Sequence, residues 1–132
     1  MGALDCSMGA VTRYTKAFAH SAKEAQKKAW EEDREYYGHR EGYSGALNAK
    51  PKGKVKVIQE EDYKHRDRWD VAEEILSGDN RFGEKYPRIQ SRSGPTGAVP
   101  LKGTQEAQNY RERSDLKGKH GTVWLLFGWC RS

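Results

Sequence analysis

The chain has 132 residues, of which 35% are hydrophobic and 33% are charged, and its net charge at pH 7 is +5. This length fits one domain and excludes two independently cored ones. No run approaches the roughly 20 apolar residues of a membrane-spanning helix, and a positive net charge argues against mimicry of DNA.

The core is expected to depend on aromatic side chains, because the chain has 4 Trp, 7 Tyr and 3 Phe in a composition poor in aliphatic residues. Cys6 and Cys130 are the only cysteines, too few and too far apart for a disulfide framework or a recognisable zinc site. Without a secretion signal at its N-terminus, the chain is expected in the cytoplasm.

Residues 1–10 show no periodicity, so we expect a flexible N-terminus followed by a single α+β domain over 11–132. Alternation predicts a strand over 11–19. Ser21 and Glu24 form a capping-box pattern that opens a helix over 22–37. Gly38 follows as the residue that a helix C-cap prefers.

The middle of the chain alternates further strands with one more helix. Patterning predicts strands over 46–49 and 54–59 and a helix over 60–76, which Ser77 and Gly78 end. The Gly- and Pro-rich segment 78–97 is expected to be a long surface loop.

The C-terminal third contains the most apolar run of the chain. Residues 98–101 read as a short strand near an edge because Pro100 interrupts them, and 104–115 could be a helix or a loop. The run 122–129 predicts a central strand in which Gly128 is a kink or a close-contact point.

This order of elements resembles a ferredoxin-like split unit with a long Gly/Pro-rich connection, in which two helices cover one face of an antiparallel sheet. The last strand would then have Val123, Leu125 and Phe127 on one face, and Trp124, Leu126 and Trp129 mostly on the other. Because two helices on one face leave the second face open, we expect a homodimer or larger assembly that covers it.

The segment 81–97 interleaves basic and aromatic side chains and is the strongest candidate for ligand binding. Its serines and glycine at 91–94 could turn successive backbone amides toward an anion, and a guanidinium beside an aromatic face suits a nucleotide. A second basic cluster lies at 111–120, and whether both clusters face one groove stays open. The alternative is a basic loop that only interacts with water. The candidate residues are Arg88, Arg92 and Arg111 for phosphate and Phe82 and Tyr86 for stacking.

A second candidate is a cluster of aromatic side chains around the end of the first helix. Trp and Tyr are enriched at protein interfaces, so an exposed cluster would suit a protein partner. The alternative is a helix cap and turn whose rings complete the core. The candidate residues are Trp30, Tyr36, Tyr37 and Tyr43.

Residues with catalytic or metal-binding spacing are not evident. The histidines stand singly, and no G-x-S-x-G or P-loop pattern occurs. The residues around Cys130 do not match a known motif of a nucleophilic cysteine. We therefore expect no catalytic residue, no bound metal and no cofactor, and we favour a binding protein over an enzyme.

Four short pieces of the chain resemble small uncharacterised proteins encoded by bacteriophages. The resemblance implies work in the cytoplasm of an infected bacterium, such as blocking a host defence enzyme, sequestering a nucleotide signal or redirecting a host polymerase. It implies no particular binding residue. The pieces are Tyr37-Gly38-His39, Gly42-Tyr43-Ser44-Gly45-Ala46-Leu47, Gly94-Pro95-Thr96-Gly97-Ala98 and Leu125-Leu126-Phe127-Gly128-Trp129.

Three functions follow from these observations. The first is a non-enzymatic phage-type accessory protein that counters host defence by binding a phosphate-containing small molecule. The second is a protein–protein inhibitor of a host defence enzyme. The third is nonspecific nucleic-acid binding, which a calculated pI of 9.2 favours.

Overall fold

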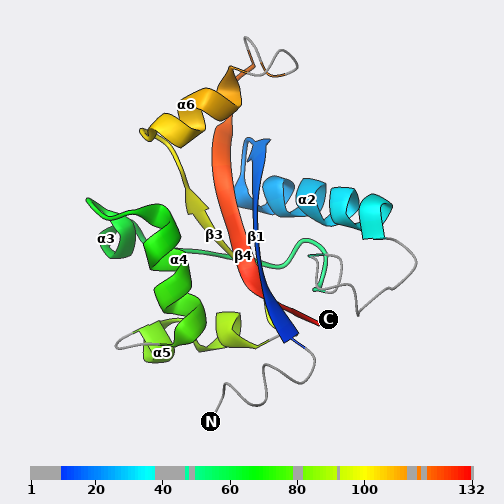
Figure 1. The fold of residues 1–132 in the computed structure, drawn as a ribbon, viewed down its shortest axis with the longest axis vertical. Coiled ribbons are helices and arrows are strands. Elements are labelled where there is room, and N and C mark those ends of the chain that lie inside the picture. The colour runs from blue at the N-terminus through cyan, green and yellow to red at the C-terminus, as the bar shows by residue number, and fades with distance from the viewer. Residues whose placement is uncertain are drawn as a thin grey trace.

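A mixed four-stranded sheet with the strand order β1-β4-β3-β2 forms the centre of the molecule (Figure 1). The computed structural model describes residues 10–37, 47, 50–78, 82–91, 93–112, 116 and 119–131. β4 pairs antiparallel with β1 and β3, whereas β2 and β3 are parallel. The α+β class is therefore confirmed, and the prediction of a strictly antiparallel sheet is wrong. The strands are β1 (Ala10–Ala19), β2 (Val55–Val57), β3 (Thr96–Pro100) and β4 (Thr122–Arg131).

Six helical segments with described bounds lie between the strands. The predicted helix 22–37 is confirmed, and the Ser21 hydroxyl accepts a hydrogen bond from the Glu24 amide over 3.2 Å as the capping pattern requires. Its predicted C-cap, Gly38, lies outside the described residues. The segments are α2 (Ala22–Tyr37), α3 (Glu60–Tyr63), α4 (Arg68–Ser77), α5 (Phe82–Lys85), the 3-10 helix η2 (Pro87–Gln90) and α6 (Gln105–Arg111).

The helices cover both faces of the sheet, with α2 on one side of the strands and α4 on the other (Figure 1). On the α2 face, the small side chains of Ala25 and Ala29 pack with Leu126 of β4. On the α4 face, larger side chains such as Ile75 pack with Leu125. The prediction of two helices on one face is therefore wrong. The alanines of α2 pack on one side of β4, and the larger apolar side chains of α4 pack on the other side.

The central strand β4 alternates between these two cores. Leu125 and Phe127 face α4 and Leu126 faces α2, as its alternation predicts. Trp129 differs from the prediction, since it packs on the α4 side and donates its indole N–H to the Leu76 carbonyl over 2.9 Å. Because α2 covers the second face, the reason for expecting a homodimer no longer holds. The structure of one chain does not test the oligomeric state.

The predicted helix 60–76 is two helices, α3 and α4, with a break between them. His65 has a positive φ of 62° in this break. Asp67 then caps α4, accepting hydrogen bonds from the amides of Trp69 and Asp70 over 2.8 and 3.1 Å. An aspartate that satisfies two open amides starts a new helix at a point where the apolar period alone would continue the old one.

The predicted loop 78–97 contains α5 and η2, which complete a crossover between the parallel strands β2 and β3. Parallel neighbours need such a connection across one face of the sheet. Within the predicted strand 46–49, Leu47 lies in a helical turn, and the other three residues are outside the described ones. The undecided segment 104–115 is helical over α6.

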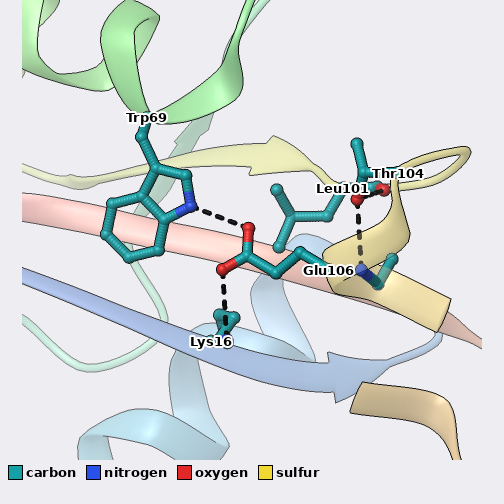
Figure 2. A network of polar contacts seen from close by, with 6 residues as sticks. Lys16, Trp69, Leu101, Thr104 and Glu106 are labelled. Atoms are coloured by element: carbon teal, nitrogen blue, oxygen red, sulfur yellow. Dashed lines mark hydrogen bonds and ion pairs between the residues drawn. The ribbon is translucent and has the colours of Figure 1, made fainter. Parts of the chain in front are cut away.

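α6 contacts the rest of the molecule through the buried Ala107 and through a network around the half-buried carboxylate of Glu106 (Figure 2). Glu106 accepts a hydrogen bond from the indole of Trp69 over 2.7 Å and an ion-pair contact from Lys16 over 3.1 Å. Thr104 caps the helix by accepting the amide of Ala107 over 3.1 Å. The network connects α6 with α4 and β1, which explains why a polar segment without a strong pattern is helical.

Candidate functional site

The strongest candidate site is a groove of about 860 Å³ near the start of β2 and β3, here called the basic groove. Among the described residues that line it, four are basic and none is acidic. The other three grooves described for the molecule each include at least one glutamate. The basic groove is lined by Gly53, Lys54, Val55, Lys56, Lys85, Tyr86, Pro87, Arg88, Ile89, Ser91, Ser93, Gly94 and Pro95.

The parallel pairing of β2 with β3 brings together the two segments that line the basic groove, residues 53–56 and residues 85–95. Val55 lies opposite Thr96, and the Thr96 amide donates to the Lys54 carbonyl over 3.1 Å. This pairing places the turn before β3 beside residues 54–56. Lys54 and Lys56 are exposed, and as alternate residues of an extended chain they lie on one face about 7 Å apart.

Lys85 is the one basic residue of the groove that the described structure neutralises. Its ammonium lies 2.8 Å from a carboxylate oxygen of the buried Asp62 and 3.8 Å from one of Glu61. The Tyr86 hydroxyl donates to the same Asp62 carboxylate and accepts the Gln59 amide over 3.1 Å. Burial, together with the Asp62 carboxylate, raises the pKa of Tyr86 to about 12. Tyr86 therefore stays protonated at neutral pH and holds Asp62 in place.

Three cations remain unpaired in the groove among the residues that the structure describes. Lys54, Lys56 and Arg88 have no carboxylate of the described residues within ion-pair distance. Lys54 and Lys56 come from the β2 segment, and the exposed Arg88 comes from η2. Cations from two segments on one concave surface raise the local potential well above what the modest net charge suggests.

Two of the amides that the sequence predicts for an anion site before β3 already have partners. The Ser93 amide donates to the Ser91 hydroxyl over 3.3 Å, and the Gly94 amide donates to the Ser91 carbonyl over 3.0 Å. A Cβ at Gly94 would lie 2.0 Å from the Arg88 carbonyl oxygen, so only glycine fits this close approach. Both amides therefore donate within the turn and are not free for an anion. The predicted amide site is wrong at Ser93 and Gly94.

A buried lysine that the sequence did not predict, Lys50, forms a hydrogen bond to this turn. Lys50 is 3% exposed, and its ammonium donates to the Ser91 carbonyl over 3.2 Å and to the Trp129 carbonyl over 2.9 Å. Burial lowers the pKa of Lys50 to about 8. A Cβ at Gly128 would lie 3.0 Å from Lys50 Cε, which confirms Gly128 as a close-contact point. This glycine was the only sequence signal of the buried lysine.

The predicted ligand residues do not all come together. Arg88 lines the basic groove, whereas Arg92 lies outside the described residues. Phe82 and Tyr86 are each only 2% exposed, so their rings pack in the core and are not presented for stacking.

Arg111 lines a separate groove of about 740 Å³ between α6 and the start of β4. There it donates to the Lys119 carbonyl over 3.2 Å, and its guanidinium lies 5.6 Å from the ring centre of Phe18. α6 and α5 lie at opposite ends of the sheet (Figure 1). Arg88 and Arg111 therefore belong to two sites, and a shared groove is not formed by them.

The predicted partner-binding aromatics are only partly described. Trp30 is half-buried and donates its indole N–H to the Lys50 carbonyl over 2.7 Å, with Lys52 lying 5.1 Å from its ring centre. Tyr36 is 82% exposed, six positions later on α2 and so on a different side of the helix. The side chain of Tyr37 and all of Tyr43 lie outside the described residues.

Other classes of site have less support in the part of the chain that the structure describes. No group of three or more His, Cys, Asp or Glu residues there could hold a metal ion. None of the described helices is long and apolar enough to cross a membrane. No family model, curated protein or solved structure matches the chain.

Proposed function

We propose that the basic groove binds a phosphate-containing small molecule through Lys54, Lys56 and Arg88. The observation that carries this proposal is the charge of the groove: its described lining has four basic residues and no carboxylate, and of these four only Lys85 has an ion pair with a described residue. An anion that enters the groove gains three cations without displacing an existing ion pair of the described residues.

The chemistry of these side chains suits phosphate. A guanidinium can donate two parallel N–H bonds to one phosphate group, and a lysine acts as a mobile point charge with three donors. The hydroxyls of Ser91 and Ser93 bond each other over 3.1 Å in the exposed turn at the same groove, which leaves one O–H of the pair as a neutral donor. Hydrogen bonds to a charged group of this kind contribute about 1.5–3 kcal/mol each.

The biological role in this proposal follows from the resemblance to small phage proteins. A non-enzymatic protein that binds a phosphate-containing signal would remove it from the host enzymes that respond to it. The described residues of the groove include no arrangement of nucleophile and base, which suits sequestration better than turnover.

Isothermal titration calorimetry with ATP as the probe tests this function. We expect the wild-type protein to bind, and Lys56→Glu and Arg88→Glu each to weaken binding by at least about tenfold. Lys64→Glu is the matched control, because it makes the same change in net charge at an exposed residue outside the groove. It should bind ATP within about twofold of wild type.

Two results would contradict the proposal. The first is no heat of binding at millimolar ATP. The second is equal weakening by the Lys64→Glu control, which would mean that net charge and not the groove attracts the anion. A single-stranded oligonucleotide titrated in parallel tests the nucleic-acid alternative. If the protein binds nucleic acid, the affinity for the oligonucleotide exceeds the affinity for ATP and falls steeply with salt concentration.

A further inference from the structure

Among the described residues, the basic groove presents cations but no exposed aromatic ring. Tyr86 is the one aromatic residue in its lining, and its ring is buried against Phe82, with the two ring centres 6.1 Å apart. Its hydroxyl is occupied by Asp62 and by the Gln59 amide. A base could therefore enter the groove without finding a ring on which to stack, and stacking is the usual sequence-tolerant source of affinity for bases.

The described lining of the groove also includes no carboxylate or amide side chain that could read the edge of a base, and its two hydroxyls, those of Ser91 and Ser93, bond each other over 3.1 Å. Adenine, guanine and cytosine each present an amino group, which an acceptor must recognise. The nearest carboxylates, those of Asp62 and Glu61, face the Lys85 ammonium at 2.8 and 3.8 Å. Lys54, Lys56 and Arg88 can only donate hydrogen bonds. These three side chains cannot pair with an amino group, and a side chain that is engaged by a phosphate oxygen is no longer free to donate to a carbonyl oxygen of a base.

The spacing of the cations favours more than one phosphate group. Lys54 and Lys56 lie about 7 Å apart along the extended chain, and Arg88 comes from η2 on another wall of the groove. A single phosphate group carries a charge of about −2 at most near neutral pH, so it cannot neutralise three cations. Two or three linked phosphates can extend along the groove and meet each cation in turn.

We infer that the basic groove recognises a linked chain of phosphate groups, such as a diphosphate or triphosphate, and leaves any attached nucleoside unread. This inference rests on the proposed function and specifies the class of ligand. Affinity should follow the number of linked phosphates. It should be nearly independent of the base.

Calorimetry in metal-free buffer tests the inference. Each probe is titrated directly, and a weak probe is measured by its competition with ATP. The probes are orthophosphate, pyrophosphate, inorganic triphosphate, ATP, GTP, UTP, AMP and adenosine. We expect affinity to rise at least tenfold from orthophosphate to triphosphate, the three nucleoside triphosphates to agree within about threefold, and adenosine not to bind. The Lys54→Glu variant should weaken triphosphate binding more than orthophosphate binding, because the more highly charged chain engages more of the groove's cations.

The inference and the proposed function fail in different ways. A difference above tenfold among ATP, GTP and UTP, or AMP binding tighter than pyrophosphate, would overturn the inference and leave a nucleotide site in place. Equal affinity for orthophosphate and triphosphate would also overturn it. If no probe binds at millimolar concentration, the proposed function itself is wrong.

Discussion

Lys50 shows how one residue connects the turn of the basic groove to the central strand. Its ammonium bonds the carbonyls of Ser91 and Trp129 while almost fully buried. A buried ammonium costs free energy unless hydrogen bonds offset it, and the bonded carbonyls supply that offset only in part. The lowered pKa of Lys50 records the remaining cost.

This cost predicts a measurable dependence of stability on pH. The pKa of Lys50 is about 8 in the folded protein, against an ordinary value of 10.5. Between these values the unfolded chain keeps the proton and the folded chain does not, so folding becomes more favourable as pH rises through this window. Relative to Lys50→Met, the wild-type free energy of unfolding should rise by about 2 kcal/mol between pH 8 and pH 10 in urea titrations. Parallel pH profiles for the two proteins would show that Lys50 keeps its ordinary pKa.

At the scale of elements, α6 depends on the Glu106 network more than on its own helix propensity. Glu106→Ala removes the bonds to Trp69 and Lys16 and should lower the free energy of unfolding by about 1–2 kcal/mol. Glu106→Gln keeps an acceptor for the indole and should lose less. Hydrogen exchange of the α6 amides should accelerate in the alanine variant.

The control for this prediction is Glu112→Ala, which removes the same charge from an exposed residue just after α6. Urea titrations of both variants compare the two sites directly. If Glu106→Ala is as stable as Glu112→Ala, the network does not stabilise α6.

The elements that sequence predicts well are those whose signals are local. α2 has its cap at Ser21, an uninterrupted alanine stripe and no internal Gly or Pro, so its bounds follow directly from the sequence. The break before α4 was missed because the apolar period runs through it, and only the capping geometry of Asp67 shows where one helix ends and another begins.

The site was only partly predictable, for a related reason. Arg88 stood out within a basic and aromatic segment, but Lys54 and Lys56 looked like the polar side of a half-buried strand. Their approach to the turn before β3 depends on the parallel register of β2 and β3, which no local pattern encodes. Burial of Phe82 and Tyr86 likewise depends on how the crossover packs onto the sheet.

At the scale of the whole molecule, coverage of both sheet faces predicts a single chain in solution. α2 packs over Leu126 and partly over Trp124, which removes the apolar surface that would have favoured a dimer. Size-exclusion chromatography with light scattering should give the mass of one chain at micromolar concentration. A dimer mass would mean that another surface associates.

The position of β2 at the end of the sheet has a consequence for aggregation. β2 has a strand neighbour on one side only in the described sheet, and Val57 is 44% exposed there. Such an edge can add strands from other molecules, and charged lysines commonly prevent this. Lys54 and Lys56 would therefore have two roles, attracting an anion and repelling a second copy of the same edge. Exchanging them for apolar residues should cost solubility as well as affinity, whereas exchange for glutamate should cost affinity alone.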